Sequence, residues 1–340
     1  MKIVVLAGGY SPERDVSLTS GSLIANALIE NGHRVLLLDV YLGIKELPED
    51  PDALFSSTVT PPYRVGECVP DLEALKAESG NGDALIGQNV LPLCRMADRV
   101  FLALHGAMGE NGQLQATLDN YGIRYTGSGY IGSLLAMDKD LSKRLLRAAG
   151  VRTPDWVYLD PNDKSTEATI LERIGLPCVI KPCSCGSSVG VSMVETREEL
   201  TDALRAAAPW GDRILAEEKI EGRELTVGIL DGKALPLVEI IPHEGFYDYK
   251  NKYQGCTEEV CPAQVPDEVA RDASQMTVCG FEALRLRGYA RFDYILDPAG
   301  ALWCLEANTL PGMTPTSLLP QAAAAAGISY RELCERIISL

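Results

Sequence analysis

Acidic and amide side chains recur on two neighbouring apolar segments near the C-terminal end of the chain. These segments, joined by an Asp-Pro-Ala-Gly sequence, predict a β-hairpin. Because side chains alternate along a strand, Arg291 and Asp293 share one face, and Glu306 and Asn308 share one face of the partner strand. Two carboxylates and an amide oxygen suit Mg²⁺, which completes its shell with phosphate oxygens and water. The hairpin therefore predicts phosphoryl chemistry, and a solvated hairpin with scattered charges is the alternative.

A glycine- and serine-rich loop follows the apolar residues 178–180. Lys181 ends this predicted strand, and the loop 182–190 after it contains Ser187 and Ser188. Glycines and small hydroxyls let backbone N–H groups approach phosphate oxygens closely, and the lysine adds a cation. The P-loop pattern is absent, and a glycine turn between two strands is the alternative.

An acidic segment lies between two apolar stretches at 215–227. It contains Glu217, Glu218, Ile220 and Glu224. A strand followed by such a linker can hold adenine through backbone groups and ribose through the last carboxylate. A surface hairpin decorated with acidic residues is the alternative.

Length and composition indicate an enzyme-like globular chain with more than one domain. The chain has 340 residues, 46% of them hydrophobic and 23% charged, so two or three domains are expected. A net charge of −16 without a basic face argues against a nucleic-acid partner. The apolar runs are far shorter than the roughly 20 residues of a membrane span, so no membrane partner is expected. The apolar start, 1–7, is interpreted as a buried strand rather than a signal peptide.

The cysteines indicate a reducing compartment. There are 10, with no Cys-x-x-Cys pair and no zinc-site spacing. We therefore expect free thiols in a cytoplasmic protein.

Strand and helix patterns alternate in the first part of the chain. Strands are predicted at 2–6, 33–40 and 99–104, with a helix over 17–31, and this order indicates a parallel sheet. The stretch 44–84 is rich in Pro, Asp and Ser and predicts an irregular excursion.

The later part of the chain mixes strands and helices differently. A single helix is predicted over 131–149, and from 221 onward short strands alternate with turns before an amphipathic helix over 329–339. The other predicted elements are strands at 157–159, 178–181 and 214–217 and helices at 166–175 and 197–207. The expected fold class is α/β, in part α+β, with an N-terminal parallel-sheet domain (1–120), a small central α+β domain (121–212) and a C-terminal domain with a mixed or antiparallel sheet (213–340).

Three features follow one another along the chain: a strand that ends in Lys181 before a glycine loop, the acidic linker, and the Asp293, Glu306 and Asn308 set. This order resembles that of the ATP-grasp superfamily. More narrowly, the chain resembles D-alanine–D-alanine ligases nearly end to end. The sequence Gly-Gly-Tyr-Ser-Pro-Glu-Arg-Asp-Val-Ser at 8–17 is similar to the family's N-terminal substrate loop. His105-Gly-Ala-Met-Gly-Glu-Asn-Gly resembles the family's His-Gly-x-x-Gly-Glu-Asp-Gly, with Asn111 in place of Asp. The segment 125–139 resembles the family's entry to the central domain, and 308–318 its C-terminal substrate segment.

The segment 246–253 resembles the family's loop over the active site, although Lys250-Asn251 stands where Glu-Ala is usual. In relatives that use D-lactate this loop carries a histidine instead of the tyrosine pattern. Tyr253 therefore favours D-alanine over D-lactate, while D-serine stays open as a second substrate.

The resemblance implies that ATP phosphorylates one D-alanine and that the amine of a second D-alanine then attacks the acyl phosphate. The product, D-alanyl-D-alanine, would serve peptidoglycan precursor synthesis in the cytoplasm, and relatives are homodimers. Two Mg²⁺ ions, for which Mn²⁺ can substitute, would be held by Asp293, Glu306 and Asn308. The implied catalytic residues are Glu13, Ser187, Tyr253, Arg291 and Gly312. The implied ATP-binding residues are Lys139, Lys181, Ser188, Glu217, Glu218, Ile220, Glu224 and Lys252. The implied substrate-binding residues are Val16, His105, Ser317 and Leu318.

Three other functions are open at the level of sequence. Another carboxylate–amine ligase of the ATP-grasp type would lack the combination of Glu13, Ser187 and Tyr253. A dinucleotide-binding oxidoreductase is suggested by the N-terminal strand, glycines and Asp39, but Gly-x-Gly-x-x-Gly is missing. A non-catalytic nucleotide-binding module would not require the complete acidic hairpin. His105 also has a second interpretation, as a structural histidine at the end of a buried strand.

Overall fold

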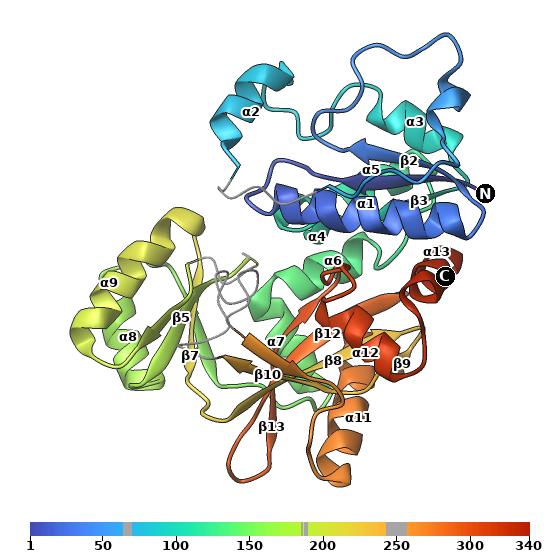
Figure 1. Cartoon of the computed structure of the whole chain (residues 1–340). Coiled ribbons are helices and arrows are strands. Elements are labelled where there is room, and N and C mark those ends of the chain that lie inside the picture. Colours follow the sequence, from blue (N-terminus) through green and yellow to red (C-terminus); the bar gives the residue numbers. More distant parts are fainter. Residues whose placement is uncertain (64–69, 185, 187–189, 243–256) are drawn as a thin grey trace.

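The structure is a computed structural model that describes residues 1–63, 70–184, 186, 190–242 and 257–340. Three separate sheets organise it, and helices lie against each of them (Figure 1). Among the described residues, no helix is both long and apolar enough to cross a membrane. The cysteines of the described part are free thiols, as expected.

The first sheet is parallel, with the strand order β2-β1-β3. Its strands are β1 (Lys2–Ala7), β2 (Arg34–Asp39) and β3 (Arg99–Leu102). From Ile3 onward β1 is buried, as expected for an apolar strand covered on both faces. Helix α1 (Arg14–Glu30) connects β1 to β2 and begins three residues before the predicted start at 17. The predicted parallel sheet is confirmed.

The stretch 44–84 is more regular than predicted. Its described residues contain the 3₁₀ turn η1 (Pro51–Leu54) and helix α2 (Leu72–Ser79), whose first turn is capped by the side chain of Asp71. Ser79 is the only buried residue of α2, so the helix has no apolar stripe from which it could be predicted. Three short helices follow: α3 (Val90–Met96), α4 (Ala107–Glu110) and α5 (Gln113–Asn120).

Two helices replace the single helix predicted over 131–149. Helix α6 (Tyr130–Met137) ends at Asp138, and helix α7 (Lys139–Ala148) begins immediately after it. Asp138 has non-helical backbone angles (φ −77°, ψ 103°), and its side chain accepts a hydrogen bond from the N–H of Leu141. Aspartate favours this N-cap geometry over a helix interior, which explains the break.

The second sheet is antiparallel, with the strand order β4-β7-β5-β6. Its strands are β4 (Trp156–Leu159), β5 (Cys178–Pro182), β6 (Ser192–Val194) and β7 (Ile214–Glu218). Helices α8 (Thr166–Arg173) and α9 (Arg197–Ala207) cover it (Figure 1), and α9 continues into the 3₁₀ turn η2 (Ala208–Trp210). Their buried side chains, such as Ile170 and Leu200, pack into one apolar cluster with Ile180.

The third sheet is antiparallel, with the order β11-β10-β8-β12-β13 and the short β9 paired to β8. Its strands are β8 (Arg223–Leu230), β9 (Lys233–Ala234), β10 (Val238–Pro242), β11 (Thr257–Val260), β12 (Tyr289–Leu296) and β13 (Leu302–Asn308). Helix α11 (Asp267–Ala283) packs on this sheet, and the prediction of strands and turns alone missed it. The buried residues of α11 are Ala273, Thr277, Gly280 and Phe281, and only one of these is large and apolar.

The last two helices return to the first sheet. Helices α12 (Leu318–Ala325) and α13 (Tyr330–Ser339) share one apolar cluster with β1, β2 and β3. In Figure 1, α13 and the C-terminus lie below α1 and β3. Arg99 of β3 donates a hydrogen bond to the carbonyl of Ile338 at 2.9 Å, which joins α13 to the first sheet.

Candidate active site

The predicted hairpin is confirmed as β12 and β13. Arg291 pairs with Asn308 and Asp293 with Glu306, so the four polar residues occupy opposed positions at the open end of the hairpin. At the closed end, the side chain of Asp297 accepts hydrogen bonds from the backbone of residues 299 and 301. The register shifts by one residue between Tyr294 and Asp293, so the turn and this irregularity together bring the polar residues opposite one another.

Asp293 is the centre of a hydrogen-bond network. Arg291 donates from Nε to Oδ1 and from Nη2 to Oδ2 of Asp293, both at 2.9 Å. Asn308 Nδ2 donates to Oδ2 at 2.9 Å, and Thr226 Oγ1 of β8 donates to Oδ1 at 2.6 Å. A bidentate Arg–carboxylate pair of this kind is among the stronger polar contacts in proteins. The side chain of Asp293 is only 11% exposed, and this network holds its carboxylate in one orientation.

Glu306 faces the helix pair α6–α7 rather than Asp293. Its Oε2 lies 3.7 Å from Nζ of Lys139, the first residue of α7. Glu306, Asn308 and Lys139 line a small cavity together with Glu110 and Gly186. The hairpin, α7 and the start of the glycine loop therefore meet at one place.

The hairpin offers oxygen donors that suit a divalent cation. With Asn308 Nδ2 on Asp293, the amide oxygen of Asn308 is directed elsewhere, and Glu306 is partly exposed. Two carboxylates and an amide oxygen fit Mg²⁺, which needs few protein ligands beside phosphate and water. Among the described residues, the hairpin included, no group of three or more His, Cys, Asp or Glu side chains could hold a metal ion, because the open end of the hairpin has only two carboxylates beside its amide.

The N-terminal loop packs against the turn at residues 105–110. Glu13 is buried, and its N–H donates to Ser11 Oγ at 3.1 Å. Gly106 has φ 87°, and a Cβ there would lie 2.7 Å from Ser11 Oγ and 3.6 Å from Glu13 Oε2. The absence of a side chain at Gly106 therefore allows the two segments to approach each other.

Side chains of the first turn of α1 hold the N-terminal loop in place. Ser17 Oγ donates to the carbonyl of Ala103 at 2.6 Å and accepts from the N–H of Gly8 at 2.9 Å. Val16 is buried beside it, on the first turn of α1. Arg14 forms an ion pair with Asp39 at 2.5 Å, so Asp39 stabilises the loop in this structure.

His105, which is buried, and Glu110, which is partly buried, are titratable groups beside Glu13. Burial lowers the pKa of His105, while the charge of Glu13 opposes this shift. Burial also raises the pKa of Glu110 to about 8, and the charge of Glu13 adds to the rise. Glu110 Oε2 accepts a hydrogen bond from the N–H of Gly106 at 2.7 Å. Since Arg291 also acts on both pKa values, the N-terminal loop and the hairpin face the same site.

A buried ion cluster lies between α7 and the second sheet. Glu217 accepts a hydrogen bond from Lys181 on the neighbouring strand, and its Oε2 lies 2.9 Å from Lys143 Nζ. Burial lowers the pKa of Lys143 to about 8, against the opposing charge of Glu217. Burial alone would raise the pKa of Glu217, but the two lysines lower it overall. The side chain of Glu217 therefore forms ion pairs with Lys143 and Lys181, which the sequence did not suggest.

Lys143 and Glu110 are site residues that the sequence reasoning missed. Lys143 follows Lys139 by four residues on α7, a spacing that places both on one helix face and could have identified it. Glu110 belongs to the His-Gly-x-x-Gly-Glu motif, but its position beside Glu13 depends on the tertiary structure.

The remaining predicted residues of the acidic linker differ in exposure. Glu218 is exposed at the end of β7, and its N–H donates to the carbonyl of Asp155 at 2.9 Å. Ile220 and Glu224 are partly buried, and Glu224 lies at the start of β8.

The predicted C-terminal substrate residues lie together before α12. Ser317 is the N-cap residue of α12, and its Oγ accepts from the N–H of Thr314 at 3.1 Å. A Cβ at Gly312 would lie 2.9 Å from Ser317 Oγ, so these residues are in close contact. Leu318 is buried at the first position of the helix. Four predicted residues lie outside the described part of the chain: Ser187, Ser188, Lys252 and Tyr253.

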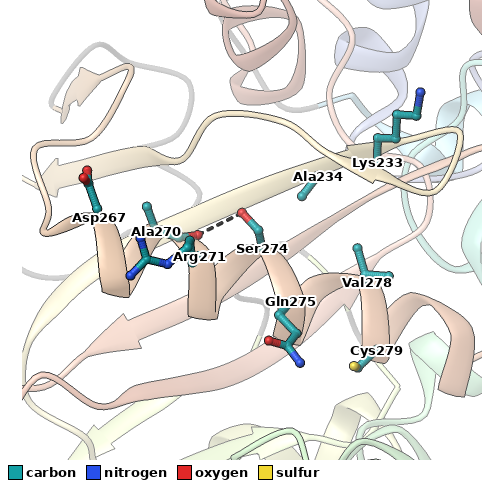
Figure 2. A pocket seen from close by; sticks show the side chains of 9 residues that line it. All are labelled: Lys233, Ala234, Asp267, Ala270, Arg271, Ser274, Gln275, Val278 and Cys279. Carbon is teal, nitrogen blue, oxygen red and sulfur yellow. Dashed lines mark hydrogen bonds between the residues drawn. The ribbon is translucent and has the colours of Figure 1, made fainter.

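A second pocket lies on the outer side of α11, beside β9 (Figure 2). None of the predicted site residues lines it. Figure 2 shows the charged side chains of Asp267 and Lys233 at opposite ends, and the hydroxyl of Ser274 donates to the carbonyl of Ala270 at 2.8 Å. Its polar groups do not converge on one point, so it is not the candidate site.

Comparison with known proteins agrees with this geometry. The family model for the D-ala D-ala ligase N-terminus matches residues 2–128, and the model for the C-terminus matches 145–339. The D-alanine–D-alanine ligase of Pediococcus pentosaceus is 42% identical, with 99% of this chain and 97% of that protein covered. The D-alanine–D-alanine ligase of Lacticaseibacillus casei is 37% identical, with 100% of this chain and 95% of that protein covered.

Solved structures give the same assignment. The structure of D-alanine–D-alanine ligase from Bacillus anthracis complexed with ATP matches with a TM-score of 0.75 at 30% identity. That match covers 100% of this chain and 96% of the other. The expected ATP-grasp fold class is confirmed, and the oxidoreductase alternative is removed. The chain belongs to the D-alanine–D-alanine ligase family.

Proposed function

We propose that the protein joins two D-alanine molecules to D-alanyl-D-alanine with ATP, through a D-alanyl phosphate, for peptidoglycan precursor synthesis. The observation that carries this proposal is the convergence of Glu13, His105 and Arg291 on one site. They come from the N-terminal loop, the turn at residues 105–110 and the hairpin. We further propose a cytoplasmic homodimer. The domains we propose are 1–120, 121–212 and 213–340. Strand β7 falls in the third range by sequence but pairs within the second sheet.

The first D-alanine binds through its ammonium group to Glu13. The supporting observation is that Glu13 is buried in the N-terminal loop, where that loop packs closely against Gly106 of the turn at residues 105–110. Val16 and His105 line this subsite. For Ser187 and Tyr253, which lie outside the described residues, the proposed role is hydrogen bonding to Glu13, as the family resemblance implies.

Nucleotide binding uses the second sheet and α7. Lys139 and Lys181 neutralise phosphate oxygens, assisted by Ser188 and by Lys252 at the transferred group. The segment with Glu217, Glu218 and Ile220 holds adenine, and Glu224 holds ribose. The supporting observation is that Lys139 already faces the hairpin carboxylate Glu306 at 3.7 Å.

Asp293, Glu306 and Asn308 hold two Mg²⁺ ions, for which Mn²⁺ can substitute. When bound, the metal orients the phosphates and neutralises charge that develops on them. Asp293 must exchange part of its present hydrogen bonding with Arg291 and Asn308 to become a ligand.

The reaction proceeds in two steps that balance in atoms and charge. A carboxylate oxygen of the first D-alanine attacks the γ-phosphorus, and ADP leaves. The amine of the second D-alanine then attacks the acyl carbon, loses a proton, and phosphate leaves with that carboxylate oxygen. Arg291 and the N–H of Gly312 stabilise the oxyanion between these events. Ser317 and the backbone N–H of Leu318 hold the carboxylate of the second D-alanine.

The direct test is a competition assay. The protein is mixed with MgATP and D-alanine, with D-serine and D-lactate also present, and phosphate release and products are followed by mass spectrometry. We expect D-alanyl-D-alanine as the main product and its loss in Glu306→Gln. Phosphate release only with D-serine or D-lactate, giving a mixed product, would contradict the substrate assignment.

A further inference from the structure

The cluster of Lys143, Lys181 and Glu217 contains two cations and one anion. Lys143 and Glu217 have side chains only 1% and 4% exposed, and that of Lys181 is 8% exposed. Buried charges are weakly screened by water, so an unbalanced positive charge here favours the arrival of an anion. The proposed function supplies such an anion in the phosphates of ATP.

The two lysines are held differently. Lys143 Nζ donates to Thr153 Oγ1 at 2.6 Å and to the carbonyl of Pro154 at 3.2 Å, and it lies 5.3 Å from the ring centre of Trp156. Within the part of the chain that the structure describes, Lys181 Nζ has its hydrogen bond to Glu217 alone. Lys143 is therefore the fixed cation, and Lys181 is the one that can turn toward a ligand.

We propose that Lys143 is a positioning residue of the nucleotide site, the permanent counter-ion of Glu217 that frees Lys181 to bind the phosphates of ATP. This inference rests on the proposed function. Without Lys143, the departure of Lys181 would leave Glu217 as a buried carboxylate without a counter-charge, and that state is costly. With Lys143 in place, Glu217 keeps one ion pair while Lys181 moves.

The position of Lys143 on α7 supports this role. Lys139 lies one helical turn earlier and faces Glu306 of the hairpin. One rigid helix thus carries a cation to the hairpin and a second cation to the base of the nucleotide site. The pKa of Lys143, about 8, still leaves it an ammonium at neutral pH.

A double-mutant cycle tests whether Lys143 acts through Glu217. The variants are Lys143→Met, Glu217→Gln and the combination, and the measurement is ATP binding by calorimetry at neutral pH without D-alanine. We expect Lys143→Met to weaken ATP binding about tenfold or more in the wild-type background. In the Glu217→Gln background the same change should cost less than about threefold, because a neutral amide needs no counter-ion.

Steady-state kinetics compares the KM values for ATP and D-alanine, and a general loss of structure would not change one of them alone. In Lys143→Met the KM for ATP should rise, while the KM for D-alanine should stay within about twofold. Arg144→Met is the matched control, because Arg144 is the next residue of the same helix and its side chain is 62% exposed. Its ATP binding should equal that of the wild type.

Equal losses in both backgrounds, or a parallel rise in the KM for D-alanine, would overturn the proposal. If Lys143→Met does not fold, Lys143→Arg replaces it, and the retained charge should keep ATP binding within about threefold. A tenfold loss in Lys143→Arg would also overturn the proposal. If the wild-type protein binds ATP but makes no dipeptide, the proposed function is contradicted. The double-mutant cycle can still be measured in that case, because it follows ATP binding alone.

Discussion

Replacing Thr226 by valine should weaken Mg²⁺ use without unfolding the protein. Thr226 Oγ1 lies 2.6 Å from Asp293 Oδ1 and 3.1 Å from the carbonyl of Phe292. Valine has nearly the same shape but cannot donate, so Asp293 loses one hydrogen bond and keeps those from Arg291 and Asn308. A hydrogen bond to a charged group is worth about 1.5–3 kcal/mol, and losing a partner that orients a metal ligand typically costs about 10- to 100-fold.

We expect the loss for Thr226→Val to be near the lower end of the roughly 10- to 100-fold range, because the bidentate contact of Arg291 still orients the carboxylate of Asp293. The Mg²⁺ concentration that gives half-maximal phosphate release should therefore rise about tenfold, or about 1.4 kcal/mol. The assay titrates MgCl₂ at saturating ATP and D-alanine, and urea unfolding of the metal-free protein is measured in parallel.

Thr277→Val is the matched control. Thr277 is fully buried, and its Oγ1 hydrogen-bonds the hydroxyl of Tyr294 at 2.8 Å, away from the carboxylate of Asp293. Each of the two variants should lose about 1 kcal/mol of unfolding free energy, but Thr277→Val should leave the Mg²⁺ dependence unchanged. Equal Mg²⁺ dependence in the two variants would refute the argument that Thr226 orients a metal ligand.

Three further variants probe burial and close packing. Burial raises the pKa of Glu110 from 4.5 to about 8, so the folded protein binds more protons than the unfolded protein between those pH values. Stability should therefore fall as pH rises through this window. Glu110→Gln should flatten that fall in urea unfolding of the metal-free protein, and an unchanged slope would contradict it. Gly106→Ala would place Cβ 2.7 Å from Ser11 Oγ at φ 87°. Initial rates should show at least about a tenfold rise in the KM for the first D-alanine, and a rise for ATP alone would disagree. Gly280→Ala would place Cβ 2.7 Å from the ring of Phe292. Thermal unfolding should then show a loss of about 1–3 kcal/mol, whereas unaltered stability would mean that this packing relaxes freely.

The fold could be predicted from sequence where periodicity was strong. The apolar runs of β1 and β2 and the hairpin turn at Asp297 carry local signals, and the structure confirms them. The break at Asp138 was missed because the apolar pattern continues across it, and only the cap geometry reveals it. Helix α11 was missed because small residues form most of its buried face.

The site could be predicted where residues are close in sequence. Alternation along two strands was enough to bring Asp293 and Asn308 together. The role of Thr226 could not be predicted, because β8 lies next to β12 only in the folded sheet. The ion pairs of Glu217 likewise join α7, β5 and β7, which no local pattern relates. Ser187 and Tyr253 remain predictions that lie outside the described residues.

Transfer of a carboxylate oxygen to phosphate tests the central claim most directly. D-alanine labelled with ¹⁸O in its carboxylate is incubated with the protein and MgATP, and the released phosphate is analysed by mass spectrometry. An acyl phosphate requires that one labelled oxygen leave with each phosphate, because the bond that breaks is between the acyl carbon and that oxygen. We predict one ¹⁸O in the phosphate for each dipeptide formed from fully labelled substrate. Dipeptide formation with unlabelled phosphate would contradict phosphorylation of the D-alanine carboxylate.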